Sequence, residues 1–320
     1  IDLAGNGACH GLIAGTTGSG KTVTEQLVAW ALANGNDPSA LRLILIDGKG
    51  GVHWRGFERE AHLCHPVIAD TAEAVAALGW ALAELDRRKQ NGQQGPRIFV
   101  VVDEVRELIA LGGAAVAEAI CRLTSLGREL GLHLLLATQY PVAEALGGAV
   151  AKANLPLRLV GRMLNASDAY VASGVKDSGA ETLTGNGDFL AAAGGALVRV
   201  QVGMATHREL YQLPRVEGEP SRLDLAAHNL DRALTATADL QPEHLALALA
   251  TNRGSRWLSA ELRIGGDRAG RLRRFAVAVL KRLEELGFEI ALRTGEGDWT
   301  KIALLGRSEC SGAECNREEE

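Results

Sequence analysis

The stretch Gly15-Thr16-Thr17-Gly18-Ser19-Gly20-Lys21-Thr22 decides the fold, because it has the spacing of a glycine, four residues and Gly-Lys-Ser/Thr. An apolar run, 11–14, precedes it, and a segment with helical period, 23–33, follows it. This order is typical of a phosphate-binding loop, whose backbone N–H groups and helix N-terminus attract an anion. We therefore expect ATP here, with Lys21 at the β- and γ-phosphates and Thr22 ligating Mg²⁺. The alternative is a glycine-rich surface turn.

Two further strand ends carry polar residues. The apolar run 98–102 ends in Asp103 and Glu104, and the run 134–138 ends in Gln139. In a parallel sheet the carboxyl ends of the strands face the bound nucleotide. We expect Asp103 beside Mg²⁺, Glu104 at the attacking water and Gln139 near the γ-phosphate. The alternatives are a strand end with a helix N-cap for the acidic pair, and a hydrogen bond holding the next loop for Gln139.

The first two thirds of the chain alternate between short apolar runs and helical patterns. The runs are 11–14, 41–46, 98–102, 132–137 and 157–160, and the helical patterns include 23–33, 71–88 and 116–130. Nearly continuous apolar strands separated by helices predict an α/β domain with a parallel sheet covered on both faces. Two short extended pieces joined by Gly194 and Gly195 predict a hairpin at the sheet edge.

The last third has a different pattern. Residues 211–240 mix proline, glycine and polar residues, which favours a linker. Residues 241–305 read as two helices, a long helix and two short strands, the order of a winged-helix DNA-binding domain. Asp267 is expected to cap the long helix. The tail, 306–320, is predicted to be disordered.

Taken together, the first-domain segments resemble the motor domain of the FtsK/SpoIIIE family of DNA translocases, in the FtsK–HerA group. The segments that carry the resemblance are 10–22, 45–49, 101–104, 127–139, 152–158 and 185–188. The resemblance implies a RecA-like P-loop ATPase motor at residues 1–210. It also implies a homo-hexameric ring that hydrolyses ATP at subunit interfaces and drives double-stranded DNA through its pore.

The resemblance also assigns roles to single residues. It implies that Lys21 and Thr22 hold phosphate and metal, that Asp103 and Glu104 serve metal and water, and that Gln139 is a sensor. Arg128 stands where the family places an arginine finger that reaches a neighbouring subunit. Among the basic residues that contact DNA in the family's pore, only Lys152 has a clear match. Arg162 is expected to substitute for another of these basic residues. Tyr140 stands where the family has arginine, and Asp47-Gly48-Lys49 replaces Asp-Pro-Lys.

Charge is unevenly distributed along the chain. The 320 residues carry a net charge of −5, with 47% hydrophobic and 23% charged residues, which excludes a disordered, fibrous or disulfide-built protein. Residues 253–282 nevertheless carry a net charge of +7. Arg268, Arg271 and Arg274 recur every three residues at the start of the predicted long helix, where helix-turn-helix proteins contact the major groove. A solvated charged helix is the alternative.

Other features bear on location and on competing functions. Five cysteines without regular spacing fit a reducing, cytoplasmic compartment. No apolar run reaches the length of a membrane span, so a membrane tether would need a segment upstream of this chain. His62, Cys64 and His65 lack a second ligand pair, which argues against zinc. The competing functions are an ATP-switched DNA-binding regulator and a HerA-like DNA-processing or packaging ATPase.

Overall fold

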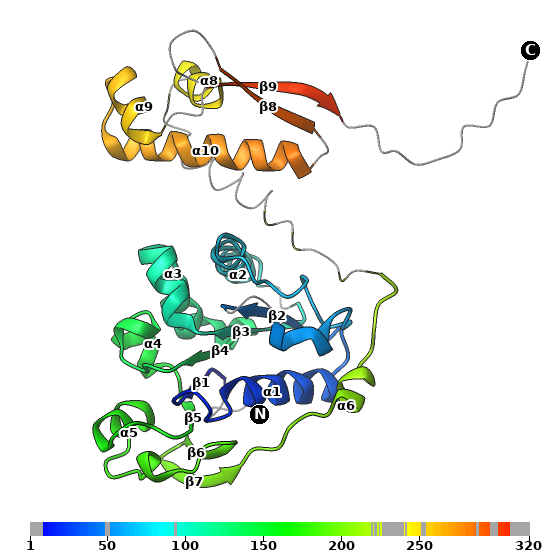
Figure 1. Cartoon of the computed structure of the whole chain (residues 1–320), viewed down its shortest axis with the longest axis vertical. Coiled ribbons are helices and arrows are strands. Elements are labelled where there is room, and N and C mark those ends of the chain that lie inside the picture. The colour runs from blue at the N-terminus through cyan, green and yellow to red at the C-terminus, as the bar shows by residue number, and fades with distance from the viewer. Residues whose placement is uncertain are drawn as a thin grey trace, which may run out of the picture. The chain divides into compact units, whose positions relative to one another are not determined.

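A computed structural model describes residues 9–48, 52–92, 95–218, 220, 223, 225, 240, 242–250, 254–285, 288–294 and 300–307. The chain divides into two compact units, Ile1–Leu223 and Asp224–Glu320, and Figure 1 shows the elements of each. The division falls inside the predicted linker, 211–240. Leu213 is buried in the core of the first unit, and Arg215 donates hydrogen bonds to the carbonyls of Gly56 and Glu58, so the start of that segment belongs to the first unit.

The first unit is built on one seven-stranded sheet. Its strands are β1 (Gly11–Ala14), β2 (Leu41–Asp47), β3 (Arg97–Asp103), β4 (Leu132–Thr138), β5 (Leu157–Val160), β6 (Asp188–Ala193) and β7 (Ala196–Gln201). Their order is β2-β3-β4-β1-β5-β6-β7, which can be followed from top to bottom in Figure 1. The first five strands are parallel, as the apolar runs predict, and β6 and β7 form the predicted antiparallel hairpin at the edge.

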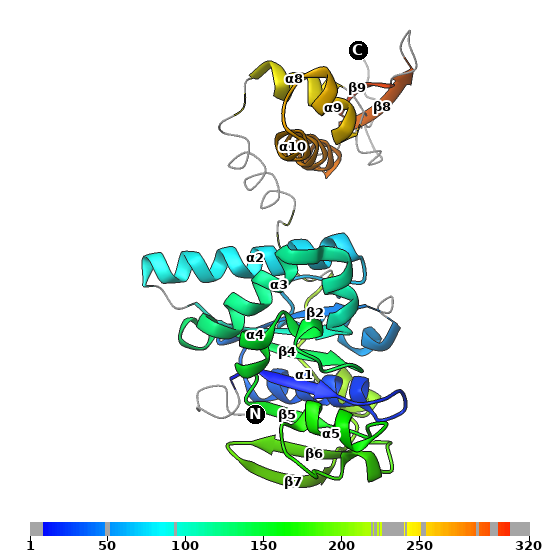
Figure 2. The ribbon, with the colours of Figure 1, turned by 90° about the vertical axis from the view of Figure 1, so that its left-hand side faces the viewer.

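Helices cover this sheet on both faces. The long ones are α1 (Lys21–Gly35), α2 (Thr71–Asn91) and α3 (Val105–Leu130). The connection from β1 to β2 runs in the opposite direction along the sheet from those that follow β2 and β3. Because such crossovers are right-handed, α1 lies on one face, and α2 and α3 lie together on the other (Figure 2). The crevice at the point of reversal lies between the carboxyl ends of β1 and β4.

Helix α3 begins eleven residues before the predicted start at residue 116, because the chain enters it directly after Glu104. It bends at Gly113, whose φ of 61° and ψ of −144° are not helical. By length and composition α3 could span a membrane. However, Val116, Ile120 and Leu123 are buried, and the helix packs on α2 and β4. It is a core helix of the first unit.

Shorter elements connect the sheet to its surroundings. They are η1 (Val52–Phe57), η2 (Glu144–Leu146), α4 (Ala149–Ala153), α5 (Ala166–Ser173), η3 (Ala180–Thr182) and α6 (His207–Tyr211). Helix α6 is anchored to α1, because the indole of Trp30 donates a hydrogen bond to the Glu209 carbonyl at 3.3 Å. It also contacts η1 at Gly56, where an added Cβ would lie 2.6 Å from Leu210 Cδ1.

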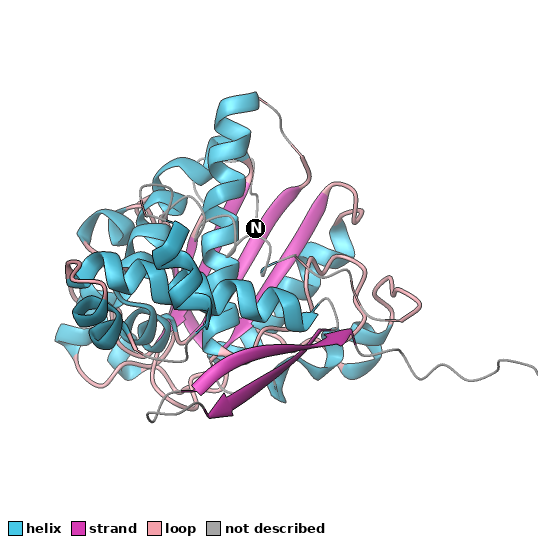
Figure 3. Cartoon of the chain, turned by 90° about the horizontal axis from the view of Figure 1, so that it is seen from above, coloured by secondary structure: helices cyan, strands magenta, loops and turns pink. Residues whose placement is uncertain are grey.

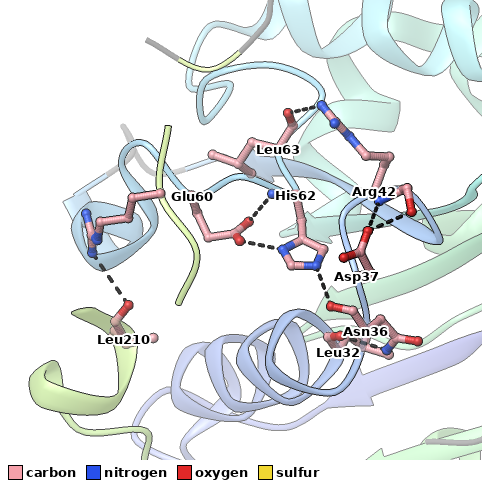
Figure 4. Close-up of polar contacts among 10 residues, drawn as sticks. Leu32, Asn36, Asp37, Arg42, Glu60, His62, Leu63 and Leu210 are labelled. Carbon is pink, nitrogen blue, oxygen red and sulfur yellow. Dashed lines mark hydrogen bonds and ion pairs between the residues drawn. The ribbon is translucent and has the colours of Figure 1, made fainter. Parts of the chain in front are cut away.

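A buried Glu60–His62 pair ties the end of α1 to the segment after η1 (Figure 4). Nδ1 of His62 lies 2.5 Å from a Glu60 carboxylate oxygen, and Nε2 lies 2.9 Å from the Asn36 carbonyl. Burial lowers the pKa of His62, but the hydrogen bonds to Glu60 and Asn36 outweigh it and raise that pKa above its ordinary value. Both imidazole nitrogens of His62 therefore have protein partners.

The described residues of the second unit form three helices followed by two antiparallel strands. They are α8 (Pro242–Ala250), α9 (Ser255–Glu261), α10 (Gly266–Glu285), β8 (Phe288–Thr294) and β9 (Thr300–Arg307). A small core forms between the helices from Ala248, Leu258, Ala269, Leu272 and Ala276. Figure 3 shows helices in cyan and strands in magenta.

Two details of this unit differ from the sequence analysis. Asp267 does not cap α10; it lies inside the first turn and forms an ion pair with Arg271 at 3.4 Å, because the helix already starts at Gly266. Gly306 and Arg307, predicted to begin the tail, are the last residues of β9. Residues 308–320, the rest of the predicted tail, lie outside the described residues.

Candidate active site

The predicted phosphate loop connects β1 to α1 and is closely packed. Gly20, with φ of 101°, precedes the first residue of α1, and an added Cβ would lie 2.8 Å from the backbone nitrogen of Gly187. Only glycine fits there, because an L side chain is strained in this conformation and would also collide with backbone. The buried ammonium of Lys21 donates hydrogen bonds to the carbonyls of Gly15 at 2.8 Å and Thr16 at 3.2 Å.

Two segments from the other half of the unit hold this loop in place. The N–H of Thr16 donates to the Arg162 carbonyl at 2.9 Å, beyond the end of β5. Before β6, the N–H groups of Asn186 and Gly187 donate to the carbonyls of Gly18 at 3.0 Å and Ser19 at 2.9 Å. We call residues 185–187 the strap. All of these contacts involve the backbone, so they fix the shape of the phosphate loop without using its side chains.

The carboxylates lie at the ends of β2 and β3, which β4 separates from β1 in the sheet. Asp47 at the end of β2 pairs in register with Asp103 at the end of β3, and each is 1% exposed. Glu104 follows in a left-handed conformation with φ of 52° and begins α3. A cavity of about 110 Å³ opens beside them, with Asp70 and Glu107 among its lining residues. The predicted acidic pair therefore lies beside a cavity, lined by both acidic and apolar side chains, at the carboxyl edge of the sheet.

A hydrogen-bond network links the phosphate loop, β4 and Glu104. The hydroxyl of Thr17 donates to Oε1 of Gln139 at 3.3 Å, and Nε2 of Gln139 donates to Oε2 of Glu104 at 3.3 Å. The other carboxylate oxygen, Oε1, accepts a hydrogen bond from the Thr138 hydroxyl at 3.4 Å. Gln139 thus contacts both the loop expected to bind phosphate and the expected catalytic carboxylate, which is the position that a sensor of the γ-phosphate needs.

The residues present fit a nucleoside triphosphate with Mg²⁺. Oγ of Ser19 is fully buried and has no hydrogen-bond partner among the described residues, and Lys21 supplies a cation at the start of a helix. In the described part of the chain no three His, Cys, Asp or Glu side chains gather to form a metal cage. Magnesium bound with a nucleotide is held mostly by phosphate oxygens and water, and Thr22 and Asp103 are the protein groups that would complete its coordination here.

Three other predicted residues of the first unit lie away from this centre. Arg128 is exposed in the last turn of α3, at the end of the sheet opposite the phosphate loop, because α3 runs back along the strands. Lys152 lies in α4, and its ammonium donates to the Pro141 carbonyl at 2.7 Å. Arg162 flanks the phosphate loop through its backbone carbonyl, and its side chain is exposed.

The three arginines of α10 differ in their surroundings. Arg268 and Arg274 are exposed, whereas Arg271 is only 21% exposed and is paired with Asp267. A spacing of three residues turns each successive side chain by about 60° around a helix, so the three do not share one face. Arg268 and Arg274 are therefore the more accessible pair.

Sequence reasoning assigned no role to the strap, to Asp47 or to Thr138. Asp47 carried a signal, because it ends an apolar strand in the same way as Asp103. Gly185 and Gly187, on either side of Asn186, were part of the family resemblance, but their contact with the phosphate loop spans about 170 residues and leaves no local pattern. Thr138 was noted only as part of the strand that precedes Gln139.

A parallel sheet with a glycine-rich loop after β1, buried carboxylates after β3 and a glutamine after β4 that contacts one of them defines a P-loop ATPase. Comparison with known proteins narrows this class. The model of the FtsK/SpoIIIE family matches residues 1–93 and 89–143. The chain belongs to the FtsK/SpoIIIE family.

Named relatives agree with this assignment. The chain is 33% identical to the DNA translocase SftA of Bacillus subtilis over 240 residues, which are 66% of this chain and 25% of SftA. It is 31% identical to the DNA translocase FtsK of Leptospira interrogans over 324 residues, 90% of this chain and 32% of that protein. It therefore spans about a quarter to a third of the length of these relatives.

Solved structures show the same fold. The conjugation coupling protein TcpA of pCW3, in its monomer form with ATPγS, is 25% identical with a TM-score of 0.54, over 63% of this chain and 61% of TcpA. The cytoplasmic domain of the type VII secretion ATPase EccC of Thermomonospora curvata is 26% identical with a TM-score of 0.57, over 68% of this chain and 29% of EccC.

Proposed function

We propose that this chain contains the motor of an ATP-driven translocase of double-stranded DNA. The observation that carries the proposal is the network that joins Thr17 of the phosphate loop to Gln139 and Glu104, in a chain of the FtsK/SpoIIIE family. A nucleotide-binding loop, a buried carboxylate and a residue in contact with both are the parts that hydrolysis coupled to movement requires.

In this function the residues of the site divide the chemistry of phosphoryl transfer. Lys21 and the N-terminus of α1 bind the β- and γ-phosphates, and Thr22 and Asp103 hold Mg²⁺, which neutralises phosphate charge. Glu104 orients the attacking water and accepts its proton. Gln139 contacts the γ-phosphate and holds Glu104, so that loss of the phosphate changes the orientation of the carboxylate.

Assembly is the second part of the proposal. Arg128 lies at the opposite end of the sheet from the phosphate loop of its own chain, so a role at a γ-phosphate requires a neighbouring subunit. A homo-hexamer in which Arg128 reaches the next subunit would make hydrolysis depend on assembly, because an arginine there stabilises charge in the transition state. Lys152 and Arg162 are the proposed contacts with DNA in the ring.

The second unit is proposed to be a winged-helix domain that recognises DNA sequence. Its order of three helices and an antiparallel pair of strands supports this, as does the net charge of +7 between residues 253 and 282. Arg268, Arg271 and Arg274 on α10 would contact guanine edges or phosphates. We further propose a cytoplasmic location, with any membrane tether supplied by sequence outside this chain.

Two substitutions and a displacement assay test the motor. Lys21→Ala removes the phosphate cation, and Glu104→Gln removes the base with almost no change in volume. Each is expected to abolish ATP hydrolysis stimulated by linear duplex DNA, and the wild type should displace a third strand from a triplex. Glu104→Gln should still bind ATP. Hydrolysis that persists unchanged in both variants would refute the assignment.

A mixing experiment tests assembly. Neither Arg128→Ala nor Lys21→Ala subunits should hydrolyse ATP alone, whereas mixed rings should recover part of the activity if Arg128 acts across the interface.

Displacement of the third strand from a triplex also distinguishes the proposed translocase from the two competing functions. An ATP-switched regulator binds DNA without displacing a third strand, and a HerA-like processing or packaging motor displaces it without preference for a DNA sequence.

A further inference from the structure

The loop that follows β4, residues 140–142, is held at three points. The ammonium of Lys152 donates to the Pro141 carbonyl at 2.7 Å. The guanidinium of Arg106, two residues after Glu104, lies 4.7 Å from the centre of the Tyr140 ring, within the range of a cation–π contact. The N–H of Tyr140 donates to the Thr138 hydroxyl at 3.1 Å. The loop is thereby fixed both to α4 and to the start of α3.

The Thr138 hydroxyl transmits this constraint to Glu104. Thr138 is fully buried, and its Oγ1 accepts a hydrogen bond from Tyr140 and lies 3.4 Å from Oε1 of Glu104. A hydroxyl has only one proton to donate. Because a carboxylate can only accept, the proton of Thr138 points toward Glu104. The Tyr140 N–H therefore helps to fix the direction in which the hydroxyl donates.

The two carboxylate oxygens of Glu104 accept hydrogen bonds from two different residues. Gln139 holds Oε2 and also contacts the phosphate loop through Thr17, so it responds to nucleotide. Thr138 holds Oε1 and responds to the loop after β4. The carboxylate is thus placed by one contact on the nucleotide side and one on the loop side.

Lys152 is the charged end of this chain of contacts. Burial, followed by the neighbouring Arg158, lowers its pKa, because its ammonium is partly withdrawn from water and donates to a neutral carbonyl. A phosphate group is a stronger acceptor than a carbonyl for an ammonium. A DNA backbone near α4 therefore competes effectively with Pro141 for Lys152.

We propose that a relay of four residues carries the contact between Lys152 and DNA phosphates to Glu104, and that Thr138 is the positioning residue at its end. The relay consists of Lys152, Pro141, Tyr140 and Thr138. When Lys152 turns to DNA, the loop after β4 is released from α4, Tyr140 and Thr138 shift with it, and Glu104 takes the orientation in which hydrolysis is fast. This rests on the proposed function, because it assumes hydrolysis at Glu104 and DNA contact at Lys152.

Steady-state ATPase kinetics of the full chain with and without linear duplex DNA test the relay. Thr138→Val removes the hydroxyl at nearly constant volume and should lower kcat with DNA about tenfold, the size of one hydrogen bond to a charged group. The KM for ATP should change less than twofold, and Thr138→Ser should restore kcat. Lys152→Met cannot hold the Pro141 carbonyl, so it should raise kcat without DNA and leave little further stimulation by DNA. Lys176→Met, at an exposed lysine between α5 and η3, is the matched control and should behave as the wild type.

The double variant decides whether the residues act through one another. If Lys152 acts through Thr138, then the variant that carries both Thr138→Val and Lys152→Met should lose the rise in kcat without DNA and match Thr138→Val. A rise that persists in the double variant would overturn the relay while leaving the motor assignment intact, as would an unchanged kcat in Thr138→Val. A wild type without DNA-stimulated hydrolysis would overturn both. Binding of a fluorescent ATP analogue checks folding, and Thr138→Ala replaces Thr138→Val if that variant does not bind.

Discussion

His10 should make the first unit less stable as the pH falls from neutral, because burial opposes its protonation in the folded state. His10 is 1% exposed, and its Nδ1 accepts a hydrogen bond from the Leu134 N–H at 3.1 Å. The ring of His133 lies 6.0 Å away and is also buried. Burial, and then the charge of His133, lower the pKa of His10 from 6.5 to about 4.

The direction and size of the effect follow from these values. Below pH 6.5 the unfolded chain binds a proton at His10, but the folded chain does so only near pH 4, so the free energy of unfolding falls as the pH falls through this window. Across the full window of about 2.5 pH units, the free energy of unfolding falls by about 3 kcal/mol. About 2 kcal/mol of this is lost between pH 7 and pH 5. Above pH 7 this histidine contributes no further change.

Urea unfolding followed by tryptophan fluorescence measures the effect, since Trp54 is fully buried in the same unit. His10→Gln keeps a carbonyl acceptor for Leu134 but cannot titrate. Between pH 7 and pH 5 its free energy of unfolding should therefore fall by about 2 kcal/mol less than that of the wild type. His53→Gln, at an exposed histidine, should match the wild type. Equal losses in wild type and His10→Gln would refute the reasoning.

Two other substitutions test how the phosphate loop is held. Gly20→Ala places a methyl group 2.8 Å from the Gly187 nitrogen at a φ of 101°, and it should abolish nucleotide binding in a fluorescence titration; binding at wild-type strength would contradict the geometry. Asp188→Asn weakens the paired contacts that Arg199 makes with this carboxylate at 2.7 and 2.9 Å, and it should lower Tm by about 2–4 °C in calorimetry at pH 7. An unchanged Tm would show that this pair, in which Asp188 is buried and Arg199 is exposed, adds nothing to stability.

Elements with a strong local signal were predictable from the sequence. Strands 41–46 and 98–102 are apolar runs, apart from Arg42 in the first, because both faces of a parallel sheet are covered. Each strand was found within one residue of its predicted bounds. The edge hairpin followed from Gly194 and Gly195. These features depend on neighbours in the sequence, which a single sequence displays directly.

Features that depend on distant contacts were not predictable in the same way. The start of α3 was missed because Gly112 and Gly113 suggest a break in helix, whereas the structure bends there and continues. Asp267 was predicted to be the N-cap because aspartate is a favourable residue at that position. The helix nevertheless begins one residue earlier, at Gly266. The hydrogen bonds of Thr138 and Lys152 join residues brought together only by the completed sheet.

The strap has a mechanical consequence. Asn186 and Gly187 hold the phosphate loop by two backbone hydrogen bonds, and β6 begins at the next residue and pairs with the edge strand β7. A force on this edge is therefore transmitted to the phosphate loop through the main chain alone, because no flexible side chain lies between them. Conversely, a change in the loop when a phosphate leaves is delivered to the outermost strand of the sheet. The β6–β7 edge of the sheet and the phosphate loop are therefore expected to move together.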